Sequence, residues 1–126
     1  MITDRHVFGW KQEEELQPII EGLLGEALLH TNSRYARHDW DCESFCVELK
    51  SRTGASTDYD KWLLPACKID KARDAKKPTI FFYYFEKDEA LFKCVYDERF
   101  NHLERSIPHF SKQEHVYVPS VWWERC

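Results

Sequence analysis

Three acidic residues and a lysine occur close together in the segment RYARHDWDCESFCVELKSR, residues 34–52. They are Asp39, Asp41, Glu48 and Lys50, and most of the segment alternates as a strand does. Carboxylates held close together repel each other unless a cation lies between them. Hard oxygen ligands suit Mg²⁺ or Mn²⁺, which bind through one or two carboxylates, water and substrate phosphate. The segment therefore predicts a divalent-metal site on a hairpin.

The alternation of side chains along a strand predicts which of these residues share a face. Glu48 and Lys50 should project together, away from the side chains on either side of Glu48. The turn leaves two registers open, with Asp39 opposite Cys46 in one and opposite Glu48 in the other. Because the registers differ by two residues, both place Asp39 and Asp41 on the face of Glu48 and Lys50. The predicted face does not depend on the turn.

These groups together would suit phosphodiester hydrolysis. A bound metal lowers the pKa of its water and neutralises charge on phosphoryl oxygens. Lys50, one pleat beyond Glu48, could orient or deprotonate that water and stabilise the pentavalent phosphorus. The competing interpretation is a solvated salt-bridge ladder on an exposed strand. The metal site is favoured because apolar neighbours predict a strand near the centre of the sheet, where exposed charge is unusual: Phe45, Cys46, Val47 and Leu49.

Two helices and several strands are predicted to position this hairpin. Apolar residues of segment 10–30 recur at helical spacing, with Pro18 inside the pattern. A second helix is predicted over 59–76, interrupted by Pro65. The other predicted elements are strands 34–40, 45–52, 78–85, 90–100 and 114–123 and a short helix over 98–106. This order predicts an α/β fold, one domain over residues 1–126, with a small mixed central sheet flanked by helices.

Composition fits a folded intracellular protein of 126 residues, with 43% hydrophobic and 15% aromatic residues. No apolar run approaches the roughly 18 residues that cross a bilayer, and the first residues lack an apolar signal-peptide core. The five cysteines are scattered, without a C-x-x-C pair. Cys42 and Cys46 could suggest zinc, but His109 and His115 are too far apart for the usual second pair. Buried free thiols and a cytoplasmic or nuclear location are expected.

Charge is distributed unevenly along a chain whose net charge is −4. Residues 1–29 contain six acids and two bases, whereas residues 50–77 contain eight bases and four acids. The acidic segment could serve a metal and the basic segment could serve phosphate. Ordinary solvated charge explains the same distribution equally well.

The chemistry-bearing residues resemble a known signature. Asp39 with V-E48-L-K50 resembles the D…(D/E)-x-K signature of the PD-(D/E)XK nuclease superfamily, which has the restriction-endonuclease-like fold. The string ELKSR is similar to the E-[VIL]-K-[ST]-R form of Holliday-junction resolvases and of many small phage and viral nucleases. The order of elements matches over roughly residues 10–96. His38 replaces the proline that usually precedes the aspartate.

The resemblance implies a metal-dependent endonuclease, with DNA expected as the substrate rather than RNA, no membrane partner, and a homodimer as one expected state. Asp39 and Glu48 would bind Mg²⁺ or Mn²⁺, and Lys50 would assist the attacking water. The family often adds a glutamate from the first helix; Glu13 is nearest the centre of the apolar stripe, with Glu15 and Glu21 as alternatives. Four basic residues are predicted to contact backbone phosphates: Arg52, Lys61, Lys68 and Lys71.

Two other functions compete with the nuclease. One is a catalytically inactive relative that binds nucleic acid or a protein partner, and the other is a plain interaction domain. The intact set of Asp39, Glu48 and Lys50 argues against inactivity. The pair Trp122-Trp123 could stack on bases or seal a homodimer, but burial against the first helix is the favoured expectation.

Overall fold

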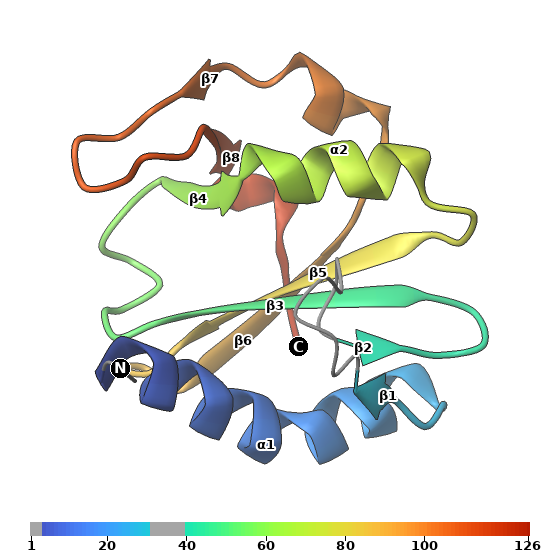
Figure 1. Cartoon of the computed structure of the whole chain (residues 1–126). Helices are drawn as coiled ribbons and strands as arrows, with labels where there is room; N and C mark the ends of the chain where they lie inside the picture. Colours follow the sequence, from blue (N-terminus) through green and yellow to red (C-terminus); the bar gives the residue numbers. More distant parts are fainter. Residues whose placement is uncertain (1–3, 31–39) are drawn as a thin grey trace.

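The computed structural model has three layers (Figure 1). It describes residues 4–30 and 40–126, with the side chains of 13–29 and 40–126. Helix α1 (Asp4–Leu24) covers one face of a six-stranded sheet. Helix α2 (Ala66–Asp74) and a three-stranded sheet cover the other face. The predicted α/β class, with a mixed sheet between helices, is confirmed.

The large sheet carries the chemistry-bearing strand near its centre. Its order is β1 (Leu29–His30), β2 (Trp40–Asp41), β3 (Cys46–Arg52), β5 (Thr79–Phe85), β6 (Ala90–Val95) and β9 (Glu124–Arg125). Strands β3 and β5 are parallel, and the other neighbours in the sheet are antiparallel. A parallel pair needs a long crossover, and here the crossover contains α2. The crossover therefore places α2 over the face of β3 that it crosses.

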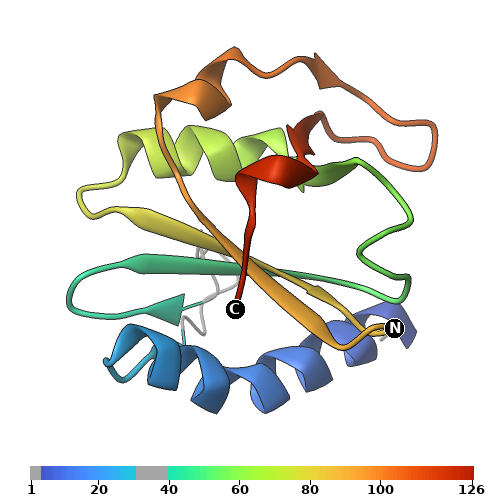
Figure 2. The ribbon, with the colours of Figure 1, turned by 180° about the vertical axis from the view of Figure 1, so that it is seen from behind.

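The small sheet was not expected from the sequence. It contains β4 (Lys61–Pro65), β8 (His115–Pro119) and β7 (Arg105–Ser106), in that order. Two 3₁₀ helices, η1 (Glu98–His102) and η2 (Ser120–Trp122), flank β7 and β8 in the chain. Seen from behind, the C-terminal segment runs from η2 across the layers to pair with β6 (Figure 2).

Side chains of β3 alternate between two hydrophobic cores. Val47 and Leu49 face the α1-side core, which also contains Leu16 and Ile20 of α1. The α2-side core is built around aromatic and aliphatic residues from α2, β4, β5 and β8, including Ile69, Trp62, Phe81, Tyr83 and Val116. Strand β5 runs beside β3 in register, with Glu48 next to Phe81 and Lys50 next to Tyr83. Glu48 and Lys50 thus project toward the α2 side, as their spacing predicted.

Helix α1 begins and ends earlier than the predicted range 10–30. Pro18 lies inside it, on the exposed side, without ending it. The helix stops at Gly25, whose φ of 70° is left-handed and suits glycine. Leu28 extends the apolar pattern without extending the helix, because it is buried after the turn and its N–H donates to Glu21 Oε2 at 2.7 Å.

The predicted helix over 59–76 is wrong in its first part, which forms β4. Trp62 and Leu64 are buried while their neighbours are more exposed, a two-residue period that buries one face against β8. Pro65 comes directly before α2, where its missing N–H costs nothing. The apolar cluster in this segment suited either a strand or a helix, and pairing with distant β8 decided between them.

The remaining elements agree in part with the sequence. Predicted strand 78–85 agrees with β5, and predicted strand 90–100 was too long because β6 ends at Val95. Predicted strand 34–40 lies almost wholly outside the described residues, and the helix over 98–106 shortens to η1. Pro119 ends β8, so strand 114–123 was too long. Trp123 is buried, but against Trp62 at 5.4 Å between ring centroids rather than against α1. Neither described helix is both long and apolar enough to cross a membrane.

Candidate active site

A cavity of about 180 Å³ opens between β3, β5, β4 and the first turn of α2. Three of its lining residues are ionisable, namely Glu48, Lys50 and Lys68. The other lining residues are apolar: Leu49, Leu64, Pro65, Phe81 and Phe82. The side chains of Leu49 and Phe82 belong to the α1-side core, so these two residues do not supply the apolar walls. A concave apolar site with a few convergent polar groups is typical of ligand-binding sites.

Glu48 is the buried acid of this cavity. Glu48 is 8% exposed and lies on β3, the third strand of the six-stranded sheet. A salt-bridge ladder in solvent would leave this carboxylate exposed, so the ladder interpretation of Glu48 is wrong. Burying a carboxylate costs free energy unless a cation or several hydrogen bonds compensate it. The site must therefore supply a positive partner.

Lys68 supplies that partner in the described structure. Its Nζ lies 3.3 Å from Glu48 Oε1 and 3.2 Å from Oε2. The side chains of Lys68 and Glu48 are 28% and 10% exposed. Lys68 lies in the first turn of α2, which begins beside the cavity because Pro65 starts the helix there. Lys68 therefore lines the cavity beside Glu48, and its contact with phosphate stays a prediction.

Lys50 lines the same cavity from β3 and shares the face of Glu48. The two residues are separated by one, so their Cα atoms lie about 6.6 Å apart along the strand. This separation lets both side chains reach one bound group. The predicted shared face is confirmed, and the catalytic role of Lys50 stays a prediction.

Asp41 lies on the same face but is engaged elsewhere. The pairs Trp40↔Val47 and Asp41↔Cys46 belong to the second of the two registers considered for the hairpin. Asp41 forms an ion pair with Lys77 Nζ, which also donates to the Cys42 carbonyl at 2.7 Å. The hydrogen bond to Asp41 raises the pKa of Lys77. This contact ties the β2–β3 turn to the segment before β5.

The other predicted metal ligands are not part of the described cavity. Asp39 lies outside the described residues, as does His38. Glu13 is half-buried on α1, and the buried side chains of α1 belong to the core on the opposite face of the sheet from Glu48. Glu15 is exposed, and Glu21 accepts the hydrogen bond from Leu28. The metal roles of Asp39 and Glu13 stay predictions.

The residues of the cavity can be compared with the ligands that a hard divalent cation such as Mg²⁺ requires. Within residues whose side chains are described, no group of three or more metal-ligating side chains occurs. Glu48 does line the cavity, and both of its carboxylate oxygens contact Lys68 Nζ, another lining residue. One or two protein carboxylates suffice for Mg²⁺, which keeps several waters. Glu48 therefore fits as one ligand of such an ion.

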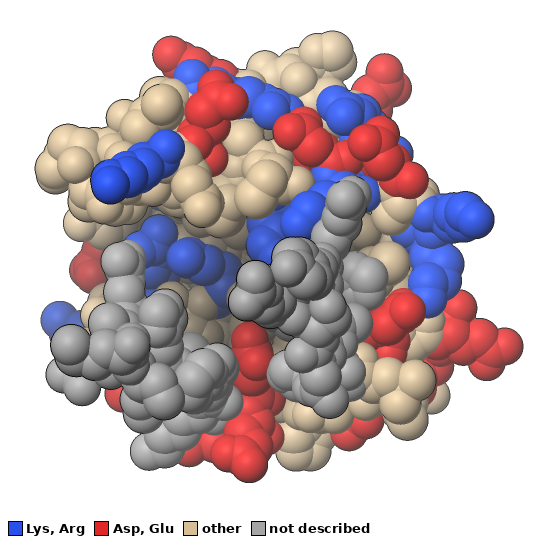
Figure 3. All heavy atoms as spheres, viewed as in Figure 1, with Lys and Arg blue, Asp and Glu red and all other residues tan. Residues whose placement is uncertain are grey.

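The remaining predicted phosphate contacts lie around the cavity. Arg52 ends β3 on the face of Glu48, Lys61 is exposed at the start of β4, and Lys71 is half-buried one turn beyond Lys68 on α2. In Figure 3, basic side chains gather in the hollow between α2 and the strands beneath it, and acidic side chains gather below, over α1. The local field at the cavity suits an anionic ligand.

Sequence reasoning missed two polar contacts near the site. Tyr83 lies within an apolar run, yet its Oη accepts from Arg52 Nε at 3.1 Å and donates to the Leu63 carbonyl at 3.1 Å. Lys77 was counted only as basic charge. The sequence carries one signal for the contacts of Tyr83, namely a hydroxyl group within an apolar run. In the sheet, Tyr83 and Arg52 lie on the same face.

No family model matches this chain, and no curated protein or solved structure matches it. The function of this protein is therefore inferred from the sequence motif and from the geometry of the site.

Proposed function

We propose that this protein is a metal-dependent nuclease, an endonuclease that hydrolyses phosphodiester bonds of DNA in preference to RNA. The observation that carries the proposal is the burial of Glu48 at the wall of a cavity that Lys50 and Lys68 also line. A carboxylate on a central strand is costly, and an apolar residue would pack there at lower cost. Buried ionisable groups in a cavity are candidates for function.

Glu48 would be one metal ligand, with Asp39 as the second. Bound Mg²⁺ or Mn²⁺ would supply a water of lowered pKa and neutralise charge on the phosphoryl oxygens. These ligands are the hard oxygens that such ions prefer.

Lys50 would act on the reacting groups directly. Lys50 lies on the face of Glu48. Its charged ammonium could orient the attacking water, and its neutral amine could instead accept a proton from that water. In the charged form it stabilises the negative charge that develops on phosphorus. Lys68 compensates the charge of Glu48 before substrate arrives. With substrate present, Lys68 would contact backbone phosphates, together with Arg52, Lys61 and Lys71.

The second candidate is an inactive relative that binds nucleic acid or a protein. One observation favours it: Lys68 contacts both carboxylate oxygens of Glu48, so the pair is already compensated without a metal. In that case Glu48 would be a structural residue. Cleavage separates the two candidates.

The experiment is cleavage of labelled single-stranded, duplex and branched DNA and of RNA, with Mn²⁺ or with EDTA. The variants are Glu48→Gln and Lys50→Met, with Glu86→Gln and Lys87→Met on the exposed β5–β6 turn as matched controls. We expect metal-dependent cutting that falls by at least about 100-fold in both site variants. The controls should cut at the wild-type rate. Undiminished cutting by Glu48→Gln, or no cutting on any substrate, would refute the nuclease.

A further inference from the structure

A chain of two hydrogen bonds joins three strands beside the cavity. Arg52 Nε of β3 donates to Tyr83 Oη of β5, and Tyr83 Oη donates to the Leu63 carbonyl of β4. Tyr83 is 1% exposed, and burial raises its pKa, so its hydroxyl keeps the proton that it donates to Leu63. Both ends of the Tyr83 hydroxyl are thus used, which fixes its orientation.

Among the residues whose side chains are described, only Tyr83 forms a side-chain hydrogen bond with the Arg52 guanidinium. The Nε–H is used by Tyr83, and the two Nη groups carry four further N–H donors in one plane. Among the described residues, no carboxylate forms an ion pair with Arg52. Such a planar edge matches the oxygens of a phosphate in a bidentate contact.

The backbone of Arg52 is fixed as well. Its carbonyl accepts from the Glu86 N–H at 2.9 Å, where β3 and β5 end together. Arg52 is four residues from Glu48 on the same face of β3, so the two Cα atoms lie about 13 Å apart. Arg52 thus lies two pleats beyond Glu48, and its Nε is already held by Tyr83. This position suits a phosphate further along the chain of a bound nucleic acid.

We propose that Arg52 binds a backbone phosphate of nucleic acid away from the scissile bond, and that Tyr83 is the positioning residue that orients its guanidinium. The bound strand then follows β3 from Glu48 past Lys50 to Arg52. The proposal rests on the proposed function for the class of ligand, nucleic acid, but it does not require cleavage.

The test measures binding of fluorescently labelled single-stranded and duplex DNA in EDTA, by anisotropy, over a range of salt concentrations. Arg52→Gln should reduce the slope of log K against log salt by about 0.7–0.9, the loss of one phosphate contact. Arg52→Lys should keep most of that slope, because the charge remains. It should bind more weakly than the wild type, because an ammonium cannot form the bidentate contact of the planar guanidinium. Tyr83→Phe should raise Kd several-fold with little change in slope, whereas Tyr84→Phe, on the opposite face of β5, should change neither.

A double-mutant cycle separates positioning from a general effect on the fold. If Tyr83 acts through Arg52, then Tyr83→Phe should not weaken binding further in the Arg52→Gln background. Thermal unfolding of each variant checks that the protein remains folded. Additive losses, or an unchanged salt slope in Arg52→Gln, would overturn the proposal.

The outcomes also separate this proposal from the nuclease. Cleavage with an unchanged slope in Arg52→Gln would overturn the phosphate site and leave the nuclease standing. A reduced slope without any cleavage would support the phosphate site and refute the nuclease. If the wild-type protein neither binds nor cuts, both proposals are wrong.

Discussion

Lys68 Nζ contacts both carboxylate oxygens of Glu48, at 3.3 and 3.2 Å, and so joins the first turn of α2 to the central strand β3. The contact balances a buried negative charge at the wall of the cavity. It also means that the charge state of the site depends on two elements twenty residues apart in the sequence. The account of the site follows from this pair.

Lys68→Met should destabilise the protein by about 1–3 kcal/mol at neutral pH, because it removes the Lys68 ammonium from the buried Glu48 carboxylate. Urea denaturation measures the change, and Lys71→Met, one turn further along α2, is the matched control. The double variant Glu48→Gln with Lys68→Met should be more stable than Lys68→Met alone, since neither charge then remains. Equal effects of Lys68→Met and Lys71→Met would mean that the pair contributes nothing to stability.

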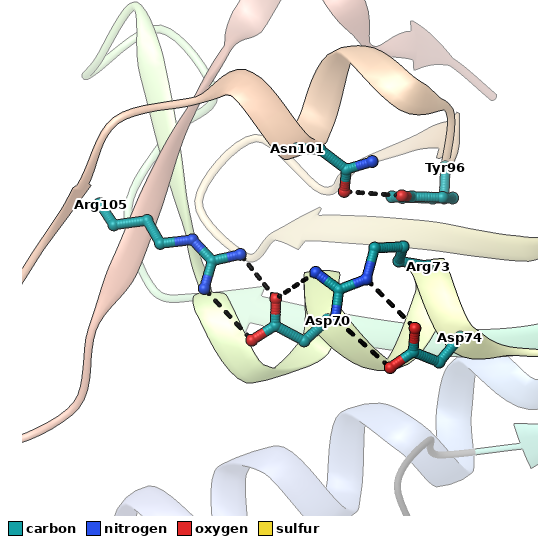
Figure 4. A network of polar contacts seen from close by, with 6 residues as sticks. All are labelled: Asp70, Arg73, Asp74, Tyr96, Asn101 and Arg105. Atoms are coloured by element: carbon teal, nitrogen blue, oxygen red, sulfur yellow. Dashed lines mark hydrogen bonds and ion pairs between the residues drawn. The ribbon is translucent and has the colours of Figure 1, made fainter.

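Protonation of Asp70 should contribute to the loss of folding stability at low pH. Arg105 Nη2 and Nη1 donate to its carboxylate at 2.6 and 3.2 Å, and Arg73 lies on its other side (Figure 4). The hydrogen bond from Arg105, ahead of the charges of Arg105 and Arg73, lowers the pKa of Asp70. A lowered folded-state pKa gives stability that is present above the unfolded value of about 3.9 and is lost as pH falls through the folded value.

In Arg105→Gln, the free energy of unfolding should therefore fall less steeply below about pH 4 than in the wild type. Above about pH 5, its dependence on pH should change little. The carboxylate is 39% exposed, so solvent screening keeps the effect under about 1 kcal/mol. Thermal unfolding between pH 2 and 6, roughly the window in which carboxylates titrate, measures it. An acid limb identical to that of the wild type would show that the Arg105–Asp70 contact does not couple to folding.

The two glycines at the end of α1 should respond in opposite directions to alanine. Gly22 is helical, and a methyl group there meets nothing within 4 Å, so Gly22→Ala should stabilise by about 0.5–1 kcal/mol. Gly25 has a φ of 70°, so Gly25→Ala should destabilise by about 1–2 kcal/mol. Urea denaturation of both variants tests the end of the helix. A stabilising Gly25→Ala would contradict the left-handed turn.

Part of the site could be predicted because it depends only on local periodicity. The two-residue period of a strand places Glu48 and Lys50 on one face in any register, and the structure agrees. Lys68, a predicted phosphate contact, lines the same cavity as Glu48 and Lys50, and that contact stays a prediction. Each of these predictions needed no knowledge of which strands pair.

The rest depends on contacts between distant segments. Strand β4 was taken for a helix because its apolar residues suit either structure, and its partner β8 lies about fifty residues later. The Arg52–Tyr83–Leu63 hydrogen bonds join three strands, so they need the sheet order before they can be expected. The contact between Asp41 and Lys77 likewise needs the crossover between β3 and β5.

The most direct measurement of the central claim is calorimetric titration of Mn²⁺ into the wild-type protein, Glu48→Gln and Lys50→Met. The account predicts binding to the wild type and to Lys50→Met, and its loss in Glu48→Gln, because Glu48 holds the ion and Lys50 serves the reacting groups. Equal binding by all three proteins, or no binding by any of them, would contradict the account and leave Glu48 with a structural role beside Lys68.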